Sequence, residues 1–393
     1  MEREDAIEEL EEGKKMHKSD KYHDFSLDQP TYCDPLRDSK NMKAINKCEN
    51  FTSDEIANYK LLVMKDGGLN LHEYSKKLKG LQKTDSNVKK MELFWIEAHR
   101  LIFGLSKLFK SDVIHHDLKP QNIVYDENKN RINFIDFGLM TSREKIYKEA
   151  RKSTYEFAIP YWYFPFEFMF LNKNTFVRFV NKSKAQRIEF FNSFMNPKNK
   201  EIYKHLKLFY QHTNNSKSFR TQNMTKFYEL IMNFTMNDYE YMLKRSVETI
   251  DIYGTGISLY NILNHSRHLM PIHLYEQLEV LFTEMVTASL DMRSTIEGVL
   301  DKYEFILENS GIMKKHNVVF IEHKLRERKN EYSTVFDSIA KTLSSMKLTS
   351  DDINSMMQPK TKTNPKKRMK TRNNRKKANV TKKSSKYSKR LKK

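Results

Sequence analysis

Two short polar segments in the first third of the chain hold side chains that can do phosphate chemistry. The first, His115 to Asn122, contains a carboxylate, a lysine two positions later and an amide three positions after the lysine. The second, Ile135 to Leu139, carries another carboxylate, Asp136. An apolar run of β type lies beside each segment, residues 122–125 beside the first and residues 132–135 beside the second.

The chemistry follows from the residue types. Phosphoryl transfer passes through a loose transition state, so a protein mostly positions groups and balances charge. Asp117 would accept or orient the proton of an attacking hydroxyl, and Lys119 would balance charge on the transferred phosphoryl group. Asn122 and Asp136 offer hard oxygen ligands of the type that Mg²⁺ takes beside phosphate oxygens and water. Gly138 is expected to let the backbone turn sharply after Asp136.

These segments resemble the catalytic loop and the metal-binding loop of the protein kinase family, which read H-R-D-L-K-P-x-N and D-F-G. Seven of the eight catalytic-loop positions agree in order and spacing. The resemblance implies an α+β, protein-kinase-like fold with a reduced N-lobe and a mostly helical C-lobe. It also implies ATP and Mg²⁺ as cofactors, with Asp117 and Lys119 as catalytic residues. Lys119, Asn122 and Asp136 would then bind the cofactor, and Asn122 and Asp136 would hold the metal.

Three later landmarks extend the resemblance. Pro165-Phe-Glu167 lies where the family ends its activation segment with A-P-E, and Asp251-Ile-Tyr-Gly-Thr-Gly256 resembles the D-x-W-x-x-G that opens the family's central buried helix. Arg293 occupies the place of the arginine that pairs with the A-P-E glutamate. We therefore expect a buried ion pair between Glu167 and Arg293, and losing one partner should cost about 3 to 5 kcal/mol.

The Lys-Pro pair that follows Asp117 and Leu118 bears on the substrate. In the family it is typical of Ser/Thr-type kinases, so the resemblance implies an ATP-dependent serine/threonine protein kinase that acts on hydroxyls of a protein substrate. Small-molecule kinases of the aminoglycoside or choline type share the fold and an H-x-D loop but usually lack this Leu-Lys-Pro. They are the less favoured alternative.

The segment from Leu61 to Gly68 resembles the family's fifth strand and the hinge that faces adenine. Met64 would be the gatekeeper, and the backbone that begins at Lys65 and Asp66 would contact the base. Met64, Lys65 and Asp66 are therefore predicted to bind the nucleotide. Residues 69–74 resemble the start of the next helix.

Further upstream, the assignment is less complete. Residues 44–51 and 22–27 are expected to supply another strand and an insertion. The acidic opening, residues 2–12, is predicted to form the helix that carries a paired glutamate, and the spacing does not choose between Glu8 and Glu12.

The chain lacks one further kinase element. Gly13 is the only glycine before Gly67, so no glycine-rich phosphate loop can form there. The spacing supports none of Lys14, Lys15 and Lys18 as the strand lysine. Either the reading frame starts too late, or this is a kinase relative that works without these parts. We expect the chain as given to bind ATP weakly and to transfer phosphate poorly.

His116 stands where the family most often has arginine. A histidine is largely neutral at cytosolic pH, so control by activation-loop phosphorylation is less expected. The segment from Asp136 to Glu167 is predicted to be a solvated loop, with regulatory phosphorylation as the alternative. Its candidate hydroxyls are Thr141, Ser142, Ser153, Thr154 and Tyr155.

The chain of 393 residues has a net charge of +20, which is unevenly distributed. Residues 360–393 carry 17 of these positive charges and no Asp or Glu, which leaves +3 for the rest. Such a tail buries too little apolar surface to offset its ordering entropy, and is predicted to be disordered. The expected organisation is a residual N-lobe (1–66), a kinase-like C-lobe (67–348) with an insertion at 168–245, and a basic tail (349–393).

Two functions are predicted for the tail. Residues 365–370 resemble a nuclear-import signal, and residues 360–393 could bind nucleic acid or an acidic partner. Cys33 and Cys48 give no disulfide framework, which favours an intracellular protein, cytoplasmic or nuclear. The most apolar stretch, residues 157–171, is interrupted by prolines and is too short for a membrane span.

The long insertion and the Lys, Asn and Tyr bias resemble the divergent kinases of large DNA viruses, which would place the protein in a host cell. The insertion is predicted to contain helices at 185–195 and 224–232. A buried helix is predicted at 91–109, and one or two helices are expected within 312–348. The alternative to an active kinase is a pseudokinase-like binding scaffold.

Overall fold

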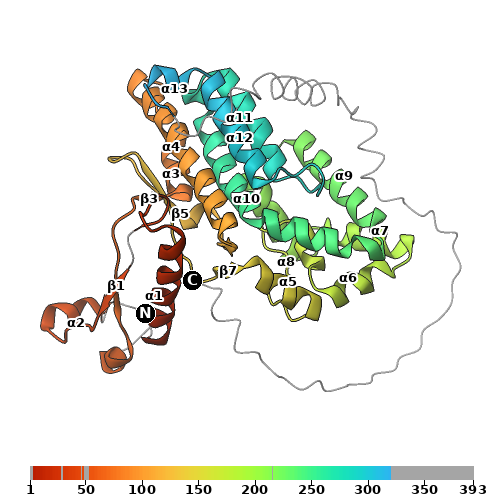
Figure 1. The fold of residues 1–393 in the computed structure, drawn as a ribbon, viewed down its shortest axis with the longest axis horizontal. Coiled ribbons are helices and arrows are strands. Elements are labelled where there is room, and N and C mark those ends of the chain that lie inside the picture. The colour runs from red at the N-terminus through yellow and green to blue at the C-terminus, as the bar shows by residue number, and fades with distance from the viewer. Residues whose placement is uncertain (1–2, 28–29, 46, 48–52, 215, 320–393) are drawn as a thin grey trace, which may run out of the picture. The chain divides into compact units, whose positions relative to one another are not determined.

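The structure, a computed structural model, describes residues 3–27, 30–45, 47, 53–214 and 216–319. In these ranges the chain is mostly helical with short strands (Figure 1), which confirms the predicted α+β, mostly helical fold class. The acidic opening forms a helix, as predicted. The first elements are α1 (Arg3–Ser19), β1 (Thr31–Cys33), α2 (Ser39–Ile45), the 3₁₀ helix η1 (Ser53–Asn58) and β2 (Leu61–Val63).

Five helices build the centre of the helical part: α3 (Leu71–Lys79), α4 (Asp85–Lys110), α10 (Tyr239–Ser266), α11 (Ile272–Met285) and α12 (Ile296–Asn309). Helix α10 contacts α3, α4 and α11, and α12 contacts α4 and α11 (Figure 1). The hydroxyl of Thr84 caps α4 by accepting the backbone N–H of Asn87. The helix predicted at 91–109 is therefore confirmed, with an earlier start.

In the described ranges the strands form three small antiparallel sheets. The largest has the order β3 (Leu69–Asn70), β5 (Ile123–Asp126), β6 (Arg131–Phe134), and the others pair β1 with β2 and β4 (Val113–Ile114) with β7 (Thr141–Ser142). Ile123 lies opposite Phe134 in the β5–β6 hairpin. Because a hairpin brings the start of its first strand beside the end of its second, Asn122 and Ile135 become neighbours.

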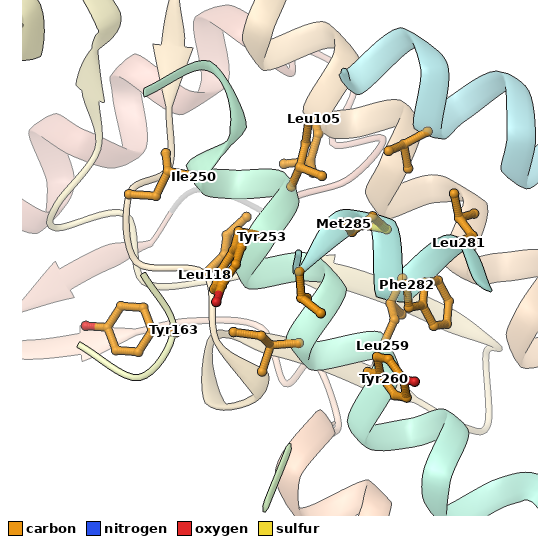
Figure 2. Packing of buried hydrophobic residues seen from close by; sticks show 14 of the residues in the cluster. Leu105, Leu118, Tyr163, Ile250, Tyr253, Leu259, Tyr260, Leu281, Phe282 and Met285 are labelled. Atoms are coloured by element: carbon orange, nitrogen blue, oxygen red, sulfur yellow. The ribbon is translucent and has the colours of Figure 1, made fainter. Parts of the chain in front are cut away.

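Helix α10 is buried along most of its length and supports the catalytic loop. Figure 2 shows Leu118 beside Tyr253, and Phe282 of α11 near Tyr260 with ring centroids 6.3 Å apart. At Gly254 a Cβ atom would lie 2.2 Å from the carbonyl oxygen of Leu118. Only glycine lets the loop approach the helix this closely.

The segment after Glu167 forms four helices: α6 (Lys173–Val180), α7 (Lys184–Phe194), α8 (Lys200–His212) and α9 (Lys217–Asn233). The predicted helices at 185–195 and 224–232 are confirmed, while α6 and α8 were not predicted. Phenylalanine rings hold the insertion together. The rings of Phe194, Phe209 and Phe227 have centroids 5.2 to 5.8 Å from that of Phe166.

Two predictions about element boundaries are wrong. Helix α10 begins at Tyr239, twelve residues before Asp251, so Asp251 does not open it. The reason is that buried apolar residues continue upstream at helical spacing, which extends the helix into the predicted insertion. Residues 44 and 45 belong to α2 rather than to a strand, and β1 is the strand that pairs with β2.

Several predicted segments fall outside the described residues. Of the strand expected at 44–51, residues 46 and 48–51 lie outside them. The helices expected at 312–348 are described only for α13 (Ile312–Lys315) and the residues to 319. The basic tail, 349–393, lies outside entirely, so its predicted disorder and partners stay predictions.

The predicted ion pair between Glu167 and Arg293 is confirmed. Arg293 Nη1 lies 2.6 Å from Glu167 Oε1, and both side chains are 0% exposed. Arg293 also donates to the carbonyl of Thr287 from Nε (3.0 Å) and Nη2 (2.8 Å), and the Ser246 hydroxyl donates to Glu167. Burying two charges is tolerated here because both partners are hydrogen-bonded as well as paired.

No helix in the described ranges is both long and apolar enough to cross a membrane.

Replacing Arg293 with Met should destabilise the protein by about 3 to 5 kcal/mol, because Glu167 would be left as an uncompensated buried charge. Arg151→Met is the matched control, since Arg151 pairs with Glu240 at 2.7 Å but both side chains are at least half exposed. That change should cost about 1 kcal/mol or less. Urea unfolding measures the free energy of unfolding of both variants. An equal loss of stability in the two would contradict the larger contribution assigned to the buried pair.

Candidate active site

The first polar segment, His115 to Asn122, follows β4, and its backbone is hydrogen-bonded to α10. Asp251 accepts hydrogen bonds from the N–H of His115 through Oδ2 (2.8 Å) and from the N–H of His116 through Oδ1 (2.9 Å). His116 has φ +70°, in the left-handed region that non-glycine residues seldom adopt. Such backbone strain persists where surrounding contacts hold it, often at functional sites.

Asp117 follows this strained residue and is 6% exposed. Its Oδ2 atom accepts from Lys119 Nζ (2.7 Å) and from Asn122 Nδ2 (2.8 Å), while Asn122 Nδ2 also donates to the Asp117 carbonyl (2.9 Å). Among the described residues, Asp117 Oδ1 has no hydrogen-bond partner. The carboxylate is thus held by one oxygen, while the other is buried and has no partner in the described part of the chain.

The second segment is joined directly to the first. The N–H of Ile135 donates to the carbonyl of Asn122 (3.0 Å), and His115 Nε2 lies 3.1 Å from the carbonyl oxygen of Ile135. The ring of Phe137 packs on that of His115 with centroids 5.2 Å apart. These contacts place Asp136 beside the catalytic loop, as expected for a shared site.

The sharp turn expected at Gly138 occurs at Asp136 instead. Asp136 has φ +65°, whereas Gly138 is not among the residues with positive φ. Nor does space require glycine at 138, because a Cβ there would meet its nearest neighbours at 3.8 Å. Aspartate tolerates the left-handed region better than most residues, which lets the candidate metal ligand make the turn itself.

Tyr163 lies against the same site. Its ring centroid lies 5.2 Å from Lys119 Nζ, and the residue is 8% exposed. Burial raises the pKa of Tyr163 well above its usual range, and the charge of Asp117 raises it further. Hydrogen bonds bring Asp117, Lys119 and Asn122 together, and the bond from Ile135 to Asn122 places the loop of Asp136 beside them.

The donor set fits a magnesium ion carried by phosphate. Asn122 uses its amide nitrogen to hold Asp117, which turns its amide oxygen away from that carboxylate. Asp136 is exposed and lines the adjoining cleft. One amide oxygen and one carboxylate, completed by phosphate oxygens and water, suit Mg²⁺.

The cleft beside Asp136 is small. Its volume is about 40 Å³, against roughly 300 to 1,000 Å³ for sites that hold small-molecule ligands. Met64 lines it, as its predicted gatekeeper role requires, although the side chain is 59% exposed. The side chains of Lys65 and Asp66 are exposed and do not line it; Asp66 instead accepts the N–H of Gly68 (2.8 Å).

One face of α1 closes the cleft. Glu9, Gly13, Met16 and His17 line it at helical spacing. Glu9 Oε2 and Asp136 Oδ1 each lie 3.8 Å from the point where a Cβ on Gly138 would be. The predicted glutamates, Glu8 and Glu12, have side chains outside the described part of the chain. Sequence reasoning missed Glu9, which the face shared with Gly13 and Met16 could have indicated.

The sequence predicted a solvated loop from Asp136 to Glu167. The structure shows that this segment is folded instead. Residues 143–152 form α5 (Arg143–Lys152), capped by the hydroxyl of Ser142, which accepts the N–H of Lys145. Tyr155 is 3% exposed, while Thr154 is exposed. The turn from α5 uses Ser153 in the left-handed region, which brings Tyr155 inward.

The family comparison agrees with this geometry. A model of the protein kinase domain matches residues 37–176, which include both polar segments and the buried Glu167. This match supports membership of the protein kinase superfamily, and kinase-type phosphoryl transfer is the activity that such a domain supports.

One curated relative is a titin homolog of Caenorhabditis elegans, 43% identical over 42 residues. This similarity covers 10% of the present chain and 0% of that protein to the nearest per cent. The chain therefore spans a negligible part of the length of this relative. A similarity this short carries no conclusion about the activity of the present chain.

Acid should destabilise the protein through His116. Burial lowers the pKa of His116 to about 4, so between pH 6.5 and 4 the unfolded chain binds more protons there than the folded one. Stability from this group is therefore lost as pH falls, by up to about 3 kcal/mol. Urea unfolding at several pH values should show a shallower pH slope for His116→Gln. The comparison variant is His273→Gln, at a histidine that is exposed rather than buried.

Proposed function

We propose that the chain acts as an ATP-dependent serine/threonine protein kinase, with Asp117 and Lys119 as catalytic residues and Asn122 and Asp136 as magnesium ligands. The observation that carries the proposal is the hydrogen-bonded unit of Asp117, Lys119 and Asn122, joined to the Asp136 loop through Ile135. An abandoned site has no physical need to keep these four side chains in register.

The geometry suggests how the residues divide the work. Lys119 and Asn122 occupy Oδ2 of Asp117, so Oδ1, which is buried in this structure, is the atom that would accept the proton of a hydroxyl once substrate opens the site. Lys119 would offset negative charge on the transferred group from the same loop. When bound, Mg-ATP supplies the phosphoryl group. The buried rings around His115 and His116 would keep water away from the loop on its inner side.

Serine and threonine are the proposed acceptors because of Lys119-Pro120, the pair typical of that branch of the family. Transfer to serine rather than tyrosine in a mixed peptide pool would support this assignment. Phosphotyrosine as the main product would reverse it.

A second candidate function is a pseudokinase-like scaffold, and one observation favours it. The cleft of about 40 Å³, closed by α1, has too little room for a nucleotide unless the helix moves away from Asp136. The insertion at 168–245 and the basic residues 360–393 would then supply binding surfaces, the latter for nucleic acid or an acidic partner. The nuclear-import signal at 365–370 belongs to the same proposal.

Substitution of either key carboxylate should abolish phosphoryl transfer. Asp117→Asn removes the proton acceptor and Asp136→Asn weakens the metal site, and each should lower the transfer rate by at least about a hundredfold. Asp126→Asn is the matched control on the same hairpin, where the side chain pairs with Lys129. Radiolabelled transfer to a generic basic protein measures the rates. Activity that survives both changes would rule out the assigned roles.

Nucleotide binding should be weak and dependent on magnesium. Millimolar Mg-ATP should raise the unfolding temperature of the wild-type protein slightly. ATP with a chelator, or Mg-ATP added to the Asp136→Asn variant, should not, because Asp136 would help to hold the ion that accompanies the phosphates. A thermal-shift titration measures this. Tight binding would contradict the expectation drawn from the closed cleft, and binding unaffected by Asp136→Asn would contradict the metal assignment.

A further inference from the structure

One buried contact joins the catalytic loop to the segment that follows α5. His116 Nε2 and the hydroxyl of Tyr155 form a hydrogen bond across 39 positions of sequence. His116 is 2% exposed and Tyr155 is 3% exposed. The contact touches none of Asp117, Lys119, Asn122 and Asp136 directly, so the mechanism proposed above does not use it.

Aromatic rings surround this contact and exclude water. The rings of Phe157 and Phe164 lie with centroids 5.0 and 5.3 Å from that of His116. Phe157 and Phe168 lie 6.0 and 6.4 Å from Tyr155. In such a low-dielectric setting a hydrogen bond is stronger, and leaving one of its atoms unpaired is costly.

Both partners are neutral near pH 7. Burial lowers the pKa of His116 to about 4, opposed by Asp117 and assisted by His115. Burial raises the pKa of Tyr155 well above its ordinary value, with smaller contributions from Glu149 and Asp251. The contact is therefore a hydrogen bond between uncharged groups, and it persists across the physiological pH range.

Each partner is anchored on its far side. The N–H of His116 donates to Asp251 at the centre of α10. The carbonyl of Tyr155 accepts from Asn172 Nδ2 (2.9 Å), and the hydroxyl of Ser153 accepts the N–H of Asn174 (2.9 Å). A continuous set of hydrogen bonds thus runs from the central helix, through the residue before Asp117, to the start of α6.

We propose that Tyr155 is a positioning residue. Through His116 it holds the strained peptide ahead of Asp117 and so orients the Asp117 carboxylate, and it keeps the segment of α5 docked on the catalytic loop. The effect on Asp117 rests on the proposed kinase function. The docking of the segment does not, because it follows from the contacts alone.

The test removes one hydroxyl. Tyr155→Phe keeps the ring and its packing but leaves His116 without its partner, so the segment should open roughly tenfold more often. Trypsin cleavage after the exposed Arg151 and Lys152 should accelerate by about that factor. Tyr147→Phe is the matched control, since it removes a hydroxyl from α5 of the same segment and should leave cleavage unchanged.

A pair of changes at His116 separates the hydrogen bond from packing. His116→Gln can still reach the Tyr155 hydroxyl and should stay closer to the wild-type cleavage rate than His116→Leu. The double change His116→Leu with Tyr155→Phe should cleave no faster than the faster single variant, because both remove the same bond. Additive effects in the double variant would overturn the coupling. If Tyr155→Phe folds poorly, the comparison of His116→Gln with His116→Leu still tests the hydrogen bond.

Phosphoryl transfer provides the second measurement. Tyr155→Phe should lower kcat about tenfold with little change in KM for the protein substrate, since only the orientation of Asp117 changes. If wild-type protein transfers no phosphate while Tyr155→Phe is cleaved faster, the kinase function fails and the docking role stands. Normal kcat together with faster cleavage would overturn the positioning role. Cleavage equal to that of Tyr147→Phe would overturn the docking role as well.

Discussion

The site depends on the contacts that fix the loop His115 to Asn122 to helix α10. The carboxylate of Asp251 takes two successive backbone N–H groups, and Gly254 lets the carbonyl of Leu118 touch the helix. These contacts hold His116 in the left-handed region and set the direction in which Asp117 leaves the loop. A long buried helix is a rigid support, because its own groups are packed on almost every side (Figure 2).

The rest of the site is built outward from this support. The β5–β6 hairpin brings Asn122 and Ile135 together by register, and so carries Asp136 to Asp117. The contact between His116 and Tyr155 joins two uncharged side chains inside a set of aromatic rings. The paired charges of Glu167 and Arg293 are buried elsewhere, where they fasten the end of the activation segment to the lobe.

Helix α1 sets this chain apart from an open nucleotide site. Its inner face, with Glu9, Gly13 and Met16, reaches the cleft that Asp136 lines. The buried carboxylate of Asp20 then accepts the N–H groups of Asp24, Phe25 and Ser26, which ties the end of the helix to the segment paired with Phe134.

The polar segments, the strands beside them and α4 could be predicted from the sequence, because short motifs and regular apolar spacing are local signals. The Glu167–Arg293 pair was predicted only through the resemblance to the kinase family. The start of α10, the turn at Asp136 rather than Gly138, the place of Glu9 and the bond between His116 and Tyr155 could not be predicted. Each depends on which surfaces meet across long stretches of chain. The sequence by itself determined which groups can do the chemistry. Only tertiary packing decided how closely they are held and how far the cleft beside them is closed.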